Sequence, residues 1–198
     1  MSSSPWLRAL HRARIAIVSV FAAYVFSCAF GAAQVHCGSA FALHYRDRIV
    51  GAAQSSGPLT QLNAGHRFSA GMIDFAGNLV GGTSSGLLGL FPPTGYAMAA
   101  FRGWIGGIVS VDAEHRSRLG SARSAIYYVG VVFFQLVPYS LVGGAGINLG
   151  LTLYRKPPHY EGPRWLGLPV EAMRDALRIY LLAIPLFFVA SLIEFFFG

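Results

Sequence analysis

The sequence predicts an all-α fold, a polytopic transmembrane bundle of about five helices. Of its 198 residues, 54% are hydrophobic and only 12% are charged, whereas soluble domains average about 25% charged residues. Apolar runs long enough to cross ~30 Å of hydrocarbon as a helix recur along the chain. The last of them, residues 179–197, contains Glu194 as its only carboxylate. These observations predict one transmembrane domain, residues 1–198, with the lipid bilayer as its main surroundings.

The first predicted span covers residues 15–35 and follows a basic stretch that contains Arg8, Arg12 and Arg14. A basic start followed by an apolar run is also typical of a secretory signal, but this run is longer than the 7–15 residues of a signal core. We therefore expect an uncleaved first span. Residues 37–69 are polar and predict an extramembrane segment with one short helix in its middle.

The second and third predicted spans, residues 71–91 and 96–111, form a hairpin in this interpretation. The segment between them, Pro92-Pro93-Thr94-Gly95, predicts a tight turn, which would place the two spans antiparallel and side by side. The third span has about 16 residues, short for a full crossing. Both are rich in glycine, so we expect their glycine faces to pack against each other.

The fourth predicted span, residues 125–154, is longer than one crossing and contains Pro138 and the glycine-rich segment 143–146. Proline and glycine at membrane depth predict a kinked or broken helix. Residues 169–178 begin with a proline and carry charges on one helical face, which predicts a short amphipathic helix at the membrane surface. The fifth span, residues 179–197, follows it.

Two sets of residues inside the spans are candidates for a specific role. Small residues four positions apart let helix backbones approach closely; the predicted packing glycines are Gly77, Gly81, Gly82, Gly86, Gly103, Gly107, Gly146 and Gly150. Polar groups in a span usually face a partner or a cavity; these candidates are Asp74, Asn78, Arg102, Gln135, Tyr139, Asn148 and Glu194.

Arg102 is the most informative of the polar candidates because it is a charge in the middle of a span. The structural interpretation pairs it with Asp74 or Glu194, or lets it extend to the interface. The functional interpretation is a contact with an ion, a lipid headgroup or a substrate inside the bundle. For Glu194 and the intramembrane amides, structural placement and a role in conduction or ligand binding are likewise both open.

Several classes of function are disfavoured. The six histidines and the two cysteines, Cys28 and Cys37, show no metal-ligand spacing, and no disulfide or cofactor site is expected. No histidine or lysine lies in a span to activate Ser84 or Ser85, so the sequence predicts no catalytic residues and no enzyme. The net charge of +7 is dispersed over segments between spans, which argues against nucleic-acid binding.

The distribution of basic residues gives a weak orientation. With the N-terminus inside, eight basic residues lie on the inner side and six on the outer side, which favours a cytoplasmic N-terminus. The inner residues are Arg8, Arg12, Arg14, Arg155, Lys156, Arg164, Arg174 and Arg178, and the outer residues are Arg46, Arg48, Arg67, Arg116, Arg118 and Arg123.

Three stretches in the second half of the chain carry a resemblance to a known family. They are residues 75–79 (FAGNL) followed by 101–103 (FRG), residues 137–140 (VPYS) leading into 143–150 (GGAGINLG), and residues 190–195 (ASLIEF). In this order, over roughly Gly71 to the chain's end, they resemble the stage II sporulation protein M family of small polytopic membrane proteins. The family tends to have Asn-Gly at 102–103, and Pro-His-Gly with a downstream acid at 138–140, so no role of that His and acid is carried over.

This resemblance, together with the glycine-rich faces, predicts a non-catalytic integral membrane subunit or scaffold of a larger membrane complex. Its expected partners are other membrane protein subunits or further copies of the chain, and its expected location is the bacterial inner membrane. The alternative is a permease-like subunit that transports a small molecule, an ion or a lipid through the segment 138–150 together with Arg102. A third interpretation is an intramembrane enzyme.

Overall fold

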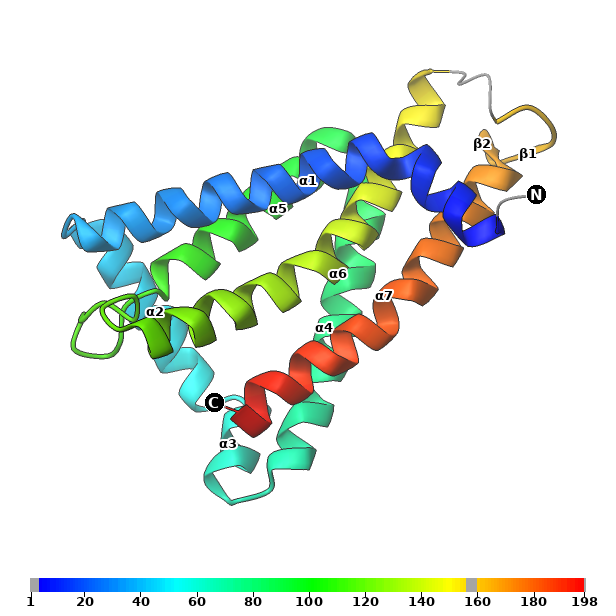
Figure 1. Ribbon diagram of the computed structural model, residues 1–198. Helices are drawn as coiled ribbons and strands as arrows, with labels where there is room; N and C mark the ends of the chain where they lie inside the picture. The colour runs from blue at the N-terminus through cyan, green and yellow to red at the C-terminus, as the bar shows by residue number, and fades with distance from the viewer. Residues whose placement is uncertain (1–3, 156–159, 198) are drawn as a thin grey trace.

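Five long helices, α1, α4, α5, α6 and α7, form an antiparallel bundle in the computed structural model, which describes residues 4–155 and 160–197 (Figure 1). Lys156, counted above among the inner charges, lies outside the described residues. The helices are α1 (Pro5–His36), α2 (Ala40–Gln54), α3 (Gly57–Asn63), α4 (Arg67–Gly89), α5 (Pro92–Ile108), α6 (Ala122–Tyr154) and α7 (Val170–Phe197). A two-stranded hairpin, β1 (Arg164–Trp165) and β2 (Leu168–Pro169), precedes α7.

Helices α1, α5 and α7 run in one direction, and α4 and α6 run in the other (Figure 1). We call the end of the bundle that holds the start of α1 the proximal end; it also holds the α4–α5 turn and the β-hairpin. The opposite, distal end holds α2, α3 and residues 109–121. Contacts between the helix ends support this arrangement: Arg67 at the start of α4 donates a 3.3 Å hydrogen bond to the carbonyl of Phe196 at the end of α7.

Three of the described helices, α1, α6 and α7, are long and apolar enough to cross a membrane. This supports an integral membrane protein and confirms the predicted all-α membrane fold in its coarse form. Helix α4 is not among the three, and α5 has 17 residues, or roughly 25 Å at 1.5 Å per residue. Helix α4 nevertheless packs against α6 and α7, and α5 packs against α1.

The core lies where α1, α5, α6 and α7 meet. Its buried side chains, Ala16, Val20, Tyr24, Ala99, Tyr139, Val142, Ile147, Ala183 and Phe187, form one continuous cluster. On α1 the buried positions are spaced three, four or seven residues apart, which places them on one helical face. Small residues on this face let α1 lie close to its neighbours: a Cβ added at Gly144 of α6 would overlap the backbone of Ile17.

Two helix boundaries differ from those predicted, for identifiable reasons. Helix α1 begins at Pro5, ten residues before the predicted span, because Ala9 and Ala13 continue its buried face beyond the apolar run. Helix α5 begins at Pro92, within the predicted turn. Proline suits the first turn of a helix, where its missing N–H has no intrahelical partner in any case, so the connection from α4 is only Leu90 and Phe91.

The sequence predicted a kinked or broken fourth span and a separate surface helix at residues 169–178. Among the described residues, neither a break in α6 nor a separate helix is present. Helix α6 is continuous through Pro138 and the glycine segment 143–146, whose residues are buried against other helices. Residues 170–178 form the first turns of α7 rather than a separate helix. Asp175, on the predicted charged face, is only 1% exposed and pairs with Arg12 of α1, whereas Arg174 of the same face stays exposed.

The predicted extramembrane segment 37–69 contains two helices, α2 and α3, instead of one. Helix α2 is connected to residues 109–121 at the distal end, where His115 Nε2 lies 3.0 Å from Oδ1 of Asp47. Arg46 is buried and donates a 3.2 Å hydrogen bond to the carbonyl of Val111. The hydrogen bond from His115, and then that from Arg46, hold the pKa of the Asp47 carboxyl below its ordinary value.

Candidate functional site

A chain of polar side chains crosses the interior of the bundle from α5 to α7. The Arg102 guanidinium lies over the ring of Tyr139, with its Cζ 4.3 Å from the ring centroid. Tyr139 Oη donates a 2.8 Å hydrogen bond to Asn78 Oδ1. Asn78 Nδ2 in turn donates to Asp74 at 2.8 Å and to Ser191 at 3.1 Å, and Ser191 Oγ donates to Asp74 at 2.7 Å. Four helices therefore contribute to one network.

Local sequence explains how these groups meet. Asp74 and Asn78 are four residues apart on α4, so they lie on the same face of the helix. Gly81, one turn further on, leaves the space that Arg102 and Tyr139 occupy: a Cβ at this position would lie 2.7 Å from Arg102 Nη2 and 2.8 Å from Tyr139 Oη. Gly81 thus contacts polar side chains rather than a helix backbone.

A vestibule of about 460 Å³ adjoins this network. Its lining combines residues from the middle of the bundle, including Arg102, Gln135 and Tyr139, with Arg118 from the distal segment 109–121. It therefore extends from the distal end into the bundle. Its remaining lining residues are Tyr24, Met98, Phe101, Ile105, Gly106, Val109, Tyr128, Val131, Val132, Leu136 and Glu194.

The direct ion pair expected between Arg102 and a carboxylate is not formed. Among the described residues, no ion pair includes Arg102, and its Nε is buried without a hydrogen-bond partner. Asp74 is connected to Arg102 only through Asn78 and Tyr139. Glu194 lies in the vestibule wall but accepts a hydrogen bond from Gln135 Nε2 instead.

The predicted packing glycines divide into three groups. Five lie at close helix contacts: an added Cβ would overlap Tyr24 at Gly103, Cys28 at Gly107, Gly86 at Gly146, Leu90 at Gly150 and the Phe187 ring at Gly82. Gly86 is the partner of Gly146, and a Cβ there would also lie 3.1 Å from Val142 Cγ1. Gly77 has nothing within 4 Å of that position, and Gly81 meets the polar network.

The partner helices differ from those expected. Gly103 and Gly107 of α5 were expected to face α4, but they contact the backbone of α1 at Tyr24 and Cys28. The reason is that α1 presents a stripe of small side chains opposite them, while α4 uses Gly86 to approach Gly146 of α6. The two glycine-rich helices therefore each pack closely on a different neighbour.

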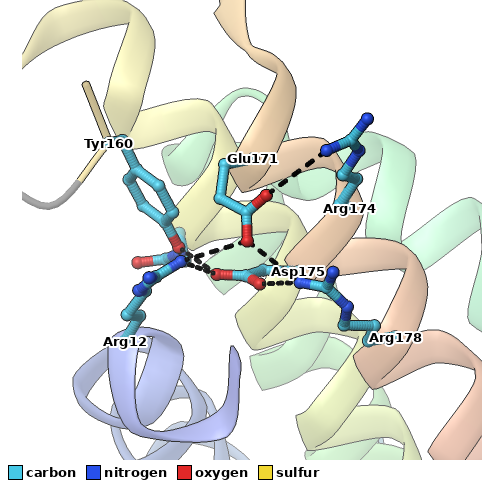
Figure 2. Close-up of polar contacts among 7 residues, drawn as sticks. Arg12, Tyr160, Glu171, Arg174, Asp175 and Arg178 are labelled. Atoms are coloured by element: carbon cyan, nitrogen blue, oxygen red, sulfur yellow. Dashed lines mark hydrogen bonds and ion pairs between the residues drawn. The ribbon is translucent and has the colours of Figure 1, made fainter. Parts of the chain in front are cut away.

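The remaining polar candidate, Asn148, lies in a second polar cluster at the proximal end, most of which Figure 2 labels. Its Nδ2 donates a 3.0 Å hydrogen bond to Tyr160 Oη, which donates to Asp175 Oδ2 at 3.2 Å. Asp175 also accepts from Arg12 Nη1 at 2.9 Å and, on its other oxygen, from Arg178 Nη1 at 2.8 Å. Burial raises the pKa of the Tyr160 hydroxyl to about 12.

Glu171 completes this proximal cluster. Its carboxylate lies 3.1 Å from Arg178 Nη1, 3.5 Å from Arg12 Nη1 and 3.8 Å from Arg174 Nη1 (Figure 2). The cluster joins α1, α6, α7 and the segment before the β-hairpin. Because Arg12 and Arg178 are paired with Asp175 and Glu171, the cluster holds these elements together.

Sequence reasoning missed half of the groups in these two clusters. Tyr24, Arg118 and Ser191 line the vestibule or extend the network, and Arg12, Tyr160 and Asp175 form the centre of the proximal cluster. Ser191 lies inside the predicted fifth span, where a single serine is common and was not singled out as a polar candidate. Asp175 did give a signal, since it is an acid between Arg174 and Arg178, but the charged face was predicted to lie on a surface.

The chain matches no protein-family model, no curated protein and no solved structure. The resemblance to the stage II sporulation protein M family therefore stays a prediction from the three sequence stretches. The geometry itself shows what the site offers chemically: a half-buried guanidinium with a vacant donor, aromatic hydroxyls, one amide and one carboxylate around a vestibule. Such groups bind and orient a ligand.

Proposed function

We propose that the protein is a non-catalytic integral membrane protein that receives a small solute or a lipid headgroup in its vestibule, as a permease-like subunit does. The observation that carries this proposal is Arg102, a cation without a carboxylate partner among the described residues, in the wall of a 460 Å³ vestibule. An ionisable residue at membrane depth usually faces a partner, a substrate or a cavity. Ligand sites typically have volumes of about 300–1,000 Å³.

In this proposal the five long helices are five membrane spans, and the fourth is kinked at Pro138. A proline inside a helix has no N–H to donate, so the carbonyl four residues earlier, that of Phe134, loses its helical hydrogen bond. The neighbouring Gln135 lines the vestibule, so the proposed kink lies at its wall. Helices α4 and α5 cross beside the three apolar helices and supply Asp74, Asn78 and Arg102.

The difference between the two ends of the bundle supports access of a ligand to the vestibule from one side of the membrane only. Arg118 of the distal segment lines the vestibule, which supports an opening at the distal end, whereas the Arg12–Asp175 ion pair ties α1 to α7 at the proximal end. With the N-terminus in the cytoplasm of a bacterium, the vestibule opens to the outer side of the inner membrane. The proximal cluster then separates it from the cytoplasm.

Cysteine labelling tests whether the vestibule contains water. In a chain with Cys28→Ser and Cys37→Ser, Val132→Cys places a thiol in the vestibule wall. The full chain is reconstituted in vesicles of known orientation and treated with a membrane-impermeant thiol reagent on either side. We expect Val132→Cys to be labelled from the distal side only.

A matched control comes from the same helix. Ile126 is 75% exposed on the outer surface of α6, where lipid would cover it, and Ile126→Cys should react from neither side. If Val132→Cys is as unreactive as Ile126→Cys, the vestibule is closed to water and the proposed function is wrong. Labelling of Val132→Cys from the proximal side would contradict the proposed direction of access.

A second function, the scaffold subunit, is favoured by one separate observation on α4. This helix is not apolar enough to be counted among the three membrane-crossing candidates, yet its outer face exposes Gly77, Val80, Thr83 and Ser84. Thr83 and Ser84 satisfy their hydroxyls on the carbonyls one turn earlier, at 2.8 and 2.9 Å. This face combines small residues with exposed apolar ones such as Val80 and Leu87, and small residues on a membrane helix let another helix approach closely.

Mild extraction followed by native mass determination tests the scaffold function. We expect a companion subunit or a second copy to remain bound to the wild-type chain and to be lost from Gly77→Leu. Gly130→Leu is the matched control, because Gly130 of α6 also has nothing within 4 Å of its Cβ position. A wild-type chain that emerges alone, or equal losses in both variants, would refute the α4 face as the contact.

A further inference from the structure

We propose that the ligand of the vestibule carries an anionic oxygen group, a carboxylate or a phosphate, on an apolar body, and that Arg102 binds the anionic group. This inference rests on the proposed function, because it specifies the class of ligand for the same vestibule. It is carried by the charges of the lining, the vacant donor of Arg102 and the apolar character of the remaining walls.

The charged groups of the vestibule favour an anion. Its lining contains two arginines, Arg102 and Arg118, and one carboxylate, Glu194. Neither arginine takes part in an ion pair among the described residues. Glu194 accepts a hydrogen bond from Gln135. A cationic ligand would meet two like charges, and a bare metal cation needs several oxygen ligands, whereas the vestibule offers one carboxylate.

Arg102 is held in a fixed orientation with a donor to spare. Its guanidinium lies over the Tyr139 ring, with Cζ 4.3 Å from the ring centroid, a cation–π contact that restricts its position. Gly81 provides the space on the α4 side. Nε is buried and has no hydrogen-bond partner in the described part of the chain, and leaving such a donor unsatisfied is unfavourable. A carboxylate or phosphate binds two donors of the fork at once.

The other walls of the vestibule suit an apolar body. Met98, Phe101, Ile105, Val131 and Leu136 contribute aliphatic and aromatic surface next to the polar groups. A pocket with mostly apolar walls and a few polar groups that fix orientation is the usual form of a small-molecule site. A fully hydrated inorganic anion would leave these walls uncovered, so an anionic group with an attached hydrocarbon portion fits better.

The experiment uses the full chain in lipid nanodiscs and radiolabelled hexanoate as the probe. Binding above that of empty nanodiscs is measured by equilibrium dialysis, with hexylamine, hexanol and acetate as competitors. We expect saturable binding of hexanoate that acetate displaces only at higher concentration and that hexylamine and hexanol do not displace. If hexylamine or hexanol displaces hexanoate as well as unlabelled hexanoate does, the site does not select an anion and the inference is wrong.

Three variants assign the binding to Arg102. Arg102→Gln should weaken hexanoate binding about tenfold or more, because a charge-assisted hydrogen-bond pair is lost. Arg102→Lys should keep part of the affinity, since the charge remains without the planar fork. Arg174→Gln, an exposed arginine at the proximal end, should bind as the wild type does. Equal affinity of Arg102→Gln and the wild type would overturn the assignment.

The source of the anionic group is distinguished by the lipid. If an anionic lipid is the natural occupant, nanodiscs with phosphatidylglycerol should bind less hexanoate than nanodiscs with phosphatidylcholine alone. If a soluble anion is the natural occupant, hexanoate binding should be equal in the two kinds of nanodisc. Both results support the anionic class. Should hexanoate not bind while Val132→Cys is labelled from the distal side, the ligand class is wrong and the proposed function stands. Failure of both experiments refutes both.

Discussion

Arg12 and Arg102 both extend from a long helix into the bundle, but they meet opposite surroundings. Arg12, at the proximal end, donates to Asp175 at 2.9 Å and lies 3.5 Å from Glu171. Arg102, in the middle of the bundle, contacts an aromatic ring and has a buried Nε without a partner. One arginine has its charge compensated by acids of the chain; the other does not.

This difference teaches how to separate a structural charge from a ligand-binding one in the same protein. Around Asp175, the charges are balanced locally, because its carboxylate pairs with Arg12 and Arg178. Arg102 lines a vestibule, and the one carboxylate of that lining, Glu194, accepts a hydrogen bond from Gln135 rather than pairing with Arg102. A buried charge is costly unless something pairs with it, so an arginine that lacks an internal partner points to an external one.

Removal of the Asp175 carboxylate should produce the largest effect. Asp175→Ala leaves Arg12 and Arg178 without their shared acceptor, and breaking a buried ion pair costs about 3–5 kcal/mol of unfolding free energy. We expect the lower end, about 3 kcal/mol, because Arg12 and Arg178 are 22% and 26% exposed and regain water. The measurement is unfolding of the detergent-solubilised protein by sodium dodecyl sulfate, followed by circular dichroism.

Arg174→Ala is the matched control for this prediction. Arg174 belongs to the same cluster, but its side chain is 65% exposed and lies 3.8 Å from Glu171. Exposed pairs of this kind contribute about 0–1 kcal/mol, so the midpoint should hardly move. Equal destabilisation by Asp175→Ala and Arg174→Ala would mean that burial of the cluster does not determine its contribution.

The same substitution at both arginines should separate stability from ligand binding. Arg12→Gln should lower the unfolding free energy by about 2 kcal/mol, because the buried Asp175 loses a charged donor, and should leave hexanoate binding unchanged. Arg102→Gln should lower stability by about 1 kcal/mol or less, the value of a cation–π contact, and abolish most of the binding. Unfolding midpoints and equilibrium dialysis of the two variants check both statements. The reverse pattern would contradict the comparison.

The sequence was sufficient for the outline of the fold because long apolar runs are a local property. It predicted the long helices α1, α6 and α7 as spans, and their apolarity is a property of each run alone. It erred where long-range contacts decide. The charged face of residues 170–178 was predicted to lie on a surface, but Arg12, more than 150 residues earlier, pairs with Asp175 and buries it.

The candidate site shows the same limit. Intramembrane polar residues could be recognised one by one, because each interrupts an apolar run, but their partners could not. The expected pairing of Arg102 with a carboxylate failed because Tyr139 lies between them and provides both a ring for the cation and a hydroxyl for Asn78. Asn148 was grouped with these residues, yet its position on α6 places it at the proximal cluster.

A smaller effect is expected when the Tyr139 hydroxyl alone is removed. Tyr139→Phe keeps the ring under Arg102 but deletes the hydrogen bond to Asn78 Oδ1, which should lower the unfolding free energy by about 1 kcal/mol. Hexanoate should still bind, because the cation–π contact that orients the guanidinium remains. Loss of binding as complete as that in Arg102→Gln would instead place the hydroxyl itself in the site, contrary to the role assigned here.

The smallest effect on stability should come from the ion pair between Asp47 and His115, which lies outside both clusters. Like Arg12, His115 contacts a carboxylate, but this pair is exposed, with 47% of the Asp47 side chain accessible. The hydrogen bonds from His115 and Arg46 lower the pKa of Asp47. A carboxyl whose pKa is lowered in the folded state contributes stability above its unfolded pKa and loses it as the pH falls through the folded value. Acidification should therefore loosen α2 from residues 112–117 and leave the bundle intact.

Carbon-13 NMR of selectively labelled aspartate carboxyls checks this expectation directly. Asp47 should titrate below the ordinary aspartate value of about 3.9 in the wild type and move upward in His115→Ala, because the first and largest cause of its lowered pKa is then absent. Arg174→Ala, at the other end of the bundle, should leave the Asp47 titration unchanged. If the Asp47 pKa is also unchanged in His115→Ala, the hydrogen bond from His115 is not what lowers it. An exposed pair such as His115–Asp47 would then contribute nothing measurable, in contrast to the buried Arg12–Asp175 pair.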